Sequence, residues 1–196
     1  MIFRTLRSGA PAARRLSRGP KHKGRVKAFG ECRRGSTAVE FAIVATPFIM
    51  TVFSTFEVGW FFFANSVVDA AAINAARIVR TGEAQEAGMS KQAFYDAICP
   101  RVSVLGSCST RLTVEVRTFA SFAALAADNS ATVCADGLPA AVAAIPYQPG
   151  IVSQIVRVRI CYLYDTLNPA LGVNLAETEN GRRRLIATHL FRNEPF

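Results

Sequence analysis

The stretch GSTAVEFAIVATPFIMTVFSTFEVGWFFFA, residues 35–64, decides the architecture of this chain. It carries no charged residue from Phe41 to Phe56, and it is long enough to cross the hydrocarbon core of a bilayer as one helix. Glu40 stands near its start, where a carboxylate inside a membrane span is costly and marks a candidate functional residue. The sequence therefore predicts a transmembrane helix with one carboxylate close to its beginning.

The positive charge of the chain lies almost entirely before that stretch. Residues 1–35 carry eleven Lys/Arg against one Glu, a net charge of +10, whereas residues 36–196 carry twelve against thirteen Asp/Glu, a net charge of −1. A basic flank before an apolar helix predicts a cytoplasmic N-terminus and an exported C-terminal part. Because no Phe, Tyr or Trp lies among the basic residues from Arg4 to Lys27, and the leader runs directly into the apolar stretch, we expect no nucleic-acid partner.

The leader is open to two interpretations. Its Arg and Ser content, with few acidic residues, is typical of a mitochondrial transit peptide. Its Gly, Pro and Arg residues also offer no apolar face to bury, which is typical of a disordered cytoplasmic tail. The membrane-type stretch that follows favours the tail.

The cysteines agree with export. Cys32 lies in the leader, and the other four lie beyond the apolar stretch, at Cys99, Cys108, Cys134 and Cys161. Four cysteines in a small exported domain predict two disulfides in an oxidising compartment, with three pairings open. Proximity favours Cys99–Cys108, which would leave Cys134–Cys161. A zinc site is the weaker interpretation, because the spacings contain no CxxC pair.

Three residues inside the apolar stretch have distinct expected roles. Glu40 could be a hydrated acid that complements the helix dipole or a functional charge, and helix physics alone leaves both open. Pro47 removes one backbone hydrogen bond and predicts a kink, which membrane helices tolerate. Glu57 is expected at the outer headgroups, beside an interfacial belt formed by Trp60 and Phe61–Phe63.

The helical pattern continues beyond the membrane. Residues 64–82 are rich in Ala, with apolar residues at helical spacing, and Gly82 is a candidate C-terminal stop. A single helix from Ser36 to about Thr81 would be roughly 68 Å long at 1.5 Å per residue. We expect its second half to pack against an exported domain or other subunits.

The residues after Gly82 predict a small mixed domain. Apolar and polar residues alternate in residues 111–119 and 155–165, as in half-buried strands, and residues 184–191 could add a third. Ser90 begins a short helix that Pro100 is expected to end, and residues 119–150 read as loop plus a short helix. The predicted fold is α+β, a long N-terminal helix packed against an antiparallel sheet. The expected divisions are a leader at 1–35, a helix at 36–82 and a periplasmic domain at 83–196.

No catalytic motif stands out. The chain contains no GxSxG, HExxH, P-loop or GxGxxG pattern, and we expect neither an enzyme nor a cofactor or metal. His189 falls in a predicted strand, where a structural role is expected. Arg157 and Arg159 alternate with apolar residues and are expected on a solvated face.

Basic residues followed by RRGSTAVEFAIVATPF, Arg33 to Phe48, resemble the N-terminal signature of TadE-like pseudopilins, minor components of the tight-adherence (Flp) pilus system. The helix through NAARIVRTGEAQ and the closing residues Ala187 to Phe196 are also similar to TadE-like sequences. A glycine five residues before a glutamate is a weak signal alone, but together with the hydrophobic run that follows it is a specific signal for this family.

The resemblance implies a precursor that is processed. A prepilin peptidase would cut between Gly35 and Ser36 on the cytoplasmic side, leaving Glu40 as the fifth residue of the mature chain. Glu40 would then pair with the new Ser36 amine, of its own or a neighbouring subunit, and set the register of assembly. Implied partners are the peptidase, other pilin or pseudopilin subunits, the inner-membrane assembly platform and membrane lipid.

Two other functions remain open from the residues. An uncleaved, single-pass protein of the bacterial inner membrane could carry a periplasmic binding or structural domain. An imported organellar protein would carry its first 30 or so residues as a transit peptide. A mature terminus at Ser36 supports the pseudopilin, an intact Met1 the anchored domain, and a terminus upstream of Gly35 the imported protein.

Overall fold

The computed structural model describes residues 35–134, 144–166, 175–178 and 180–196. Its contacts divide the chain into two compact units, Met1–Ala45 and Thr46–Phe196. Residues 1–34 of the predicted leader, including Cys32, lie outside the described residues. The fold class is confirmed: a long apolar helix is followed by a small antiparallel sheet with short helices.

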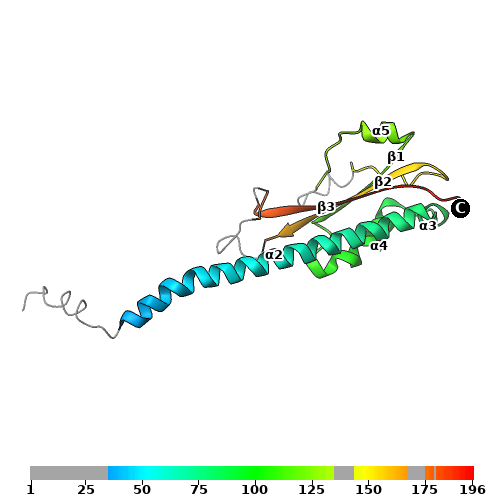
Figure 1. The fold of residues 1–196 in the computed structure, drawn as a ribbon. Coiled ribbons are helices and arrows are strands. Elements are labelled where there is room, and N and C mark those ends of the chain that lie inside the picture. Colours follow the sequence, from blue (N-terminus) through cyan, green and yellow to red (C-terminus); the bar gives the residue numbers. More distant parts are fainter. Residues whose placement is uncertain (1–34, 135–143, 167–174, 179) are drawn as a thin grey trace, which may run out of the picture. The chain divides into compact units, whose positions relative to one another are not determined.

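Helix α2, Ser36–Arg80, is the long helix that the sequence predicts (Figure 1). A window of 18 residues within it has mean hydropathy 1.7 and is not buried in the protein, so α2 is long and apolar enough to cross a membrane. This is consistent with a single-pass anchor. The helix ends at the predicted stop, since Gly82 has φ 84°, a left-handed conformation that glycine adopts at little cost.

Three antiparallel strands form one sheet in the order β1-β2-β3. The alternation of apolar and polar side chains predicts β1 and β2 almost to the residue. The third strand, predicted at residues 184–191 without such alternation, extends slightly beyond both ends of that range. The sheet has an inner face, which packs on α2, and an outer face, which turns away from it. The strands are β1 Leu112–Phe119, β2 Ile155–Asp165 and β3 Arg182–Arg192.

The core lies between the inner face of the sheet and the second half of α2. Small residues of α2 recur at helical spacing on its buried side, so the sheet approaches the helix closely. Larger side chains from the strands and from α4 fill the remaining space. The α2 residues buried in the second unit are Glu57, Ala64, Val68, Ala71, Ala72, Ala75, Ala76, Ile78 and Val79.

Helix α4, Lys91–Val102, begins where predicted, because the Ser90 side chain accepts a backbone hydrogen bond at 3.1 Å. The expectation that Pro100 ends this helix is wrong: the helix continues through it. A proline in the last turn removes only one helical hydrogen bond. Ile98 and Val102 are fully buried, so packing holds the turn in place. The other short elements are α3 Glu83–Glu86, η2 Ser103–Leu105 and α5 Phe122–Ala126.

Candidate functional site

The predicted processing site lies at the first turn of α2. The helix begins at Ser36, and the Ser36 hydroxyl donates a hydrogen bond to Glu40 Oε1 at 2.8 Å. Gly35 is exposed, and a Cβ added there would meet nothing within 4 Å. The described structure therefore gives no steric reason for a glycine at position 35. A recognition event outside the fold would supply one.

Glu40 stands in an exposed apolar surface. Its neighbours along the helix are large apolar residues. Phe41 is 74% exposed and Val44 is 68% exposed. One carboxylate on such a surface is costly in lipid unless a cation or a hydrogen-bond donor meets it. The apolar residues exposed around it are Val39 60%, Phe41 74%, Ile43 68% and Val44 68%.

Glu57 is covered by protein, which the sequence did not suggest, and its expected level at the outer headgroups stays a prediction. Its side chain is only 3% exposed and lies beneath the sheet, close to Tyr164 of β2. Burial, and then the negative charge of Glu57, raise the pKa of Tyr164 to about 12. The domain after α2 thus begins to cover the helix at Glu57, within the stretch 35–64 that the sequence predicts to span the membrane.

The residues of the predicted aromatic belt, Trp60 and Phe61–Phe63, do not share one environment. Phe61, one turn after Glu57, packs edge-on against Tyr164 with ring centroids 6.4 Å apart. The Arg183 guanidinium lies 4.9 Å from the centre of the Phe61 ring, and Arg183 also pairs with Glu177 at 3.3 Å. Phe61 therefore belongs to the junction between helix and sheet, whereas the neighbouring ring of Phe62 is 62% exposed.

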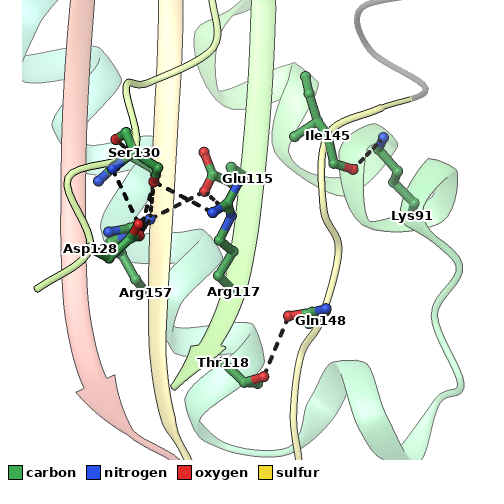
Figure 2. Close-up of polar contacts among 10 residues, drawn as sticks. Lys91, Glu115, Arg117, Thr118, Asp128, Ser130, Ile145, Gln148 and Arg157 are labelled. Atoms are coloured by element: carbon green, nitrogen blue, oxygen red, sulfur yellow. Dashed lines mark hydrogen bonds and ion pairs between the residues drawn. The ribbon is translucent and has the colours of Figure 1, made fainter. Parts of the chain in front are cut away.

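A largely buried ionic network lies on the outer face of the sheet, on strands β1 and β2 (Figure 2). Arg157 Nη2 lies 2.6 Å from Asp128 Oδ2 and 3.4 Å from Glu115 Oε1. Arg117 Nε lies 2.7 Å from the same Glu115 oxygen. Arg159 donates to the Ser130 carbonyl at 2.9 Å, and burial lowers the pKa of Arg159. The expected solvated face for Arg157 and Arg159 is wrong, because a loop folds over both.

That loop, which we call the cover segment, comprises residues 121–134. It starts with α5, whose cap Ser121 accepts a hydrogen bond from Ala124 N at 3.0 Å. It ends at Cys134, which is bonded to Cys161 of β2 with the two Cα atoms 5.5 Å apart. The ion pair of Asp128 with Arg157, hydrogen bonds to Ser130 and one disulfide therefore hold the cover segment on the sheet.

The second disulfide joins Cys99 of α4 to Cys108, with the Cα atoms 5.7 Å apart. The structure thus has the pairing that sequence proximity favours. His189 Nε2 lies 3.3 Å from Asp69 Oδ1 of α2, in keeping with a structural role. No group of three or more His, Cys, Asp or Glu side chains that could hold a metal occurs among the described residues.

The predicted site residues fall in two compact units. The first turn of α2 belongs to Met1–Ala45, and Pro47 and the four disulfide-bonded cysteines belong to Thr46–Phe196. Helix α2 runs through Pro47, whose carbonyl accepts a hydrogen bond from Thr51 Oγ1 at 2.8 Å, and the kink stays a prediction. Sequence reasoning missed the pairing of Glu57 with β2, although an acid amid apolar residues on a helix was a usable signal.

Residues 35–77 match the family model described as TadE-like protein. The match covers most of α2, including the predicted cleavage site and Glu40, and it confirms the resemblance over this segment. No curated protein and no solved structure matches the chain.

Proposed function

We propose that this chain, TadE-like over residues 35–77, is a minor pilin or pseudopilin of a tight-adherence pilus. Prepilin peptidase cuts its precursor after Gly35, and α2 then anchors it in the inner membrane. The domain after the helix lies in the periplasm, where its two disulfides form. The chain acts in assembly and adhesion by contact with other subunits and not as an enzyme.

One observation carries this proposal: Ser36 and Glu40 are joined across the first turn of α2, in a helix that contains an exposed, apolar window of 18 residues. Cleavage after Gly35 would leave a charged amine on Ser36, one helical turn from the carboxylate. A lone carboxylate in lipid is costly, whereas a carboxylate paired with an amine is much less so. The amine of a neighbouring subunit can supply the same pairing only in one axial register.

The exposed surface of α2 supports a role in packing. Apolar side chains of the first unit are exposed, and in the second unit Phe48, Phe56 and Phe62 are each more than 60% exposed. In the membrane these side chains contact lipid, and in an assembly they contact the helices of other subunits. We infer that this surface meets the pilin subunits and the assembly platform in the inner membrane.

The test is the N-terminus of the membrane-extracted protein, determined by intact mass and N-terminal sequencing with and without the prepilin peptidase. We expect a chain that begins at Ser36 only when the peptidase is present. A chain that still begins at Met1 would instead support the uncleaved membrane-anchored domain, and a terminus upstream of Gly35 the imported organellar protein.

A matched pair of variants sharpens this test. Gly35→Ala and Gly59→Ala make the same chemical change, and a Cβ at either position meets nothing within 4 Å. We expect Gly35→Ala to slow or block cleavage and Gly59→Ala to leave it unchanged. Equal processing of both variants would contradict recognition of Gly35.

A further inference from the structure

The two edge strands of the sheet, β1 and β3, differ in whether another segment of the described chain is hydrogen-bonded to their outer side. A short segment lies along β1, because Val116 N donates to the Pro146 carbonyl at 3.0 Å and Gln148 N donates to the Val116 carbonyl at 2.9 Å. Strand β3 forms the opposite edge, and no strand of the described chain pairs with its far side. One edge is therefore covered, and the other is open along the described residues.

The hydrogen bonds at the ends of β3 show which residues turn their backbone toward the open side. Asn193 N donates to the Gln154 carbonyl at 2.9 Å, so the odd-numbered residues face β2. The even-numbered residues face away. At the two ends of the strand these outward groups are satisfied, since the Arg182 carbonyl accepts from Glu177 N at 2.9 Å and Glu194 N donates to the Arg80 carbonyl at 2.9 Å.

Between those ends the outward backbone groups have no partner within the described chain. The residues that carry them also expose their side chains on the outer face, beyond the reach of the cover segment. Ile186 is 45% exposed and Leu190 52%, which is unusual for the middle of a natural edge strand. The set is Arg184, Ile186, Thr188, Leu190 and Arg192.

The side chains of this set define what would fit against it. Apolar Ile186 and Leu190 lie in the middle, and a cationic arginine lies at each end. Arg184 is held only loosely, at 4.0 Å from Glu177, and Arg192 donates to the Ser153 carbonyl through one nitrogen. A complementary strand would place apolar residues opposite the middle and a carboxylate opposite each arginine.

We propose that the open edge of β3 binds an extended segment of a partner protein by strand addition. The partner segment carries alternating apolar residues with an Asp or Glu at each end. Its backbone extends the sheet, and the two arginines select for its charge. This goes beyond the proposed function and does not depend on cleavage at Gly35.

A second copy of β3 is a poor occupant of the same edge. The antiparallel pairing centred on Thr188 uses the full length of the edge, and it places Arg184 of each copy opposite Arg192 of the other. Like charges directly opposite each other in neighbouring strands are destabilising. Other registers relieve this repulsion only by shortening the paired length.

The experiment measures binding of synthetic peptides to the full chain in detergent micelles, together with amide hydrogen exchange. One peptide spans the edge with alternating Val and Thr and a Glu at each end, and its control has Lys at both ends. We expect the Glu peptide to bind at least about tenfold more tightly than the Lys peptide, a ratio that corresponds to about 1.4 kcal/mol. We also expect the amides of Ile186, Thr188 and Leu190 to exchange rapidly in the free chain and slowly with the Glu peptide.

Two variants test the mechanism of binding. Thr188→Pro removes an outward N–H and leaves the ladder to β2 intact, and Thr188→Val is its control. We expect the proline to weaken peptide binding about tenfold or more and the valine to leave it unchanged. Both variants should retain the two disulfides and the native circular dichroism spectrum. Replacing Arg184 and Arg192 together by Glu should reverse the preference, so that the Lys peptide binds more tightly.

Three results would overturn the proposal. The first is slow exchange of these three amides in the free monomer, which would mean that the edge is already covered. The second is equal binding of the Glu and Lys peptides. The third is protection of the same amides by dimerisation of the chain alone, which would identify a second copy as the occupant.

Discussion

Arg157 of β2 and Asp128 of the cover segment form an ion pair, with Nη2 and Oδ2 2.6 Å apart. Arg157 is 3% exposed, and its other carboxylate neighbour is Glu115 at 3.4 Å. An arginine buried at this depth depends on its partners, because an uncompensated buried charge is strongly destabilising. The pair thus helps to fix the cover segment on the sheet.

The first prediction concerns acid. A hydrogen bond from Ser130, and then Arg157, hold the pKa of Asp128 below its usual range. Because the folded-state pKa lies below the unfolded one, the contribution of Asp128 to stability is complete above about pH 4 and is lost as the pH falls through the folded-state pKa. Urea midpoints measured between pH 7 and pH 2 should show this loss.

The variant Asp128→Asn isolates that contribution. We expect it to lower the urea midpoint at pH 7 and to flatten its dependence on pH below about 4. Glu86→Gln, at an exposed position of α3, is the control and should leave both unchanged. A pH profile of Asp128→Asn that parallels the wild type would contradict the role given to the pair.

The second prediction concerns alkali. Burial raises the pKa of all four tyrosines, most of all Tyr164, whose pKa is raised to about 12 in the presence of Glu57. A raised pKa means that the folded state favours the neutral phenol. The contribution of the tyrosines to the free energy of unfolding is therefore fully present below about pH 10, and it is lost as the pH rises toward 12. Absorbance of the phenolate should show little ionisation of the native protein at pH 10.

Tyr164→Phe tests whether Tyr164 is the tyrosine that ionises at the highest pH. We expect it to remove the last tyrosine transition near pH 12 and to reduce the loss of stability between pH 10 and 12. Tyr95→Phe is the comparison, because Tyr95 packs against the core without Glu57 nearby. If the highest transition survived in Tyr164→Phe, the placement of Glu57 against Tyr164 would be wrong.

The third prediction concerns the end of α2. Gly82 has φ 84°, and a Cβ added there would collide with the ring of Phe196. We expect Gly82→Ala to destabilise the protein by about 1–3 kcal/mol, through backbone strain and displacement of that ring. Thermal unfolding measures the effect.

Gly59→Ala in the same helix is the matched control, because nothing lies within 4 Å of a Cβ at that position. We expect it to be neutral or stabilising by up to about 1 kcal/mol, since alanine has the higher helix propensity. Equal melting temperatures for the two variants would refute the strain at Gly82.

The fourth prediction concerns Glu40. The change Glu40→Val removes the only charge of the apolar helix ahead of Glu57, so membrane insertion should be unchanged or improved. Incorporation into the pilus machinery should fall sharply, because the Ser36 amine would have no carboxylate partner. Pelleting of assembled pili followed by immunoblotting measures this incorporation, and Glu86→Gln is again the control. Normal piliation in Glu40→Val would refute the pairing.

Much of the fold follows from local patterns in the sequence. Apolar residues at helical spacing mark α2, alternation marks β1 and β2, and Gly82 and Ser90 mark a helix end and a helix start. These signals are local, because each depends on the period of one element. The TadE-like signature around Gly35 is equally local, since a few neighbouring residues carry the resemblance.

By itself the sequence determined the long apolar helix and the α+β class, because periodicity and short-range spacing specify them. Only the tertiary structure decided the environments of Glu57, Arg157 and Arg159. Each of these side chains is buried or partly covered by a segment far away in the chain: Glu57 and β2 lie together, and the cover segment contacts the buried Arg157 and the half-buried Arg159. Burial by a distant segment is a property of the assembled layers, and no pattern within a single helix or strand encodes it.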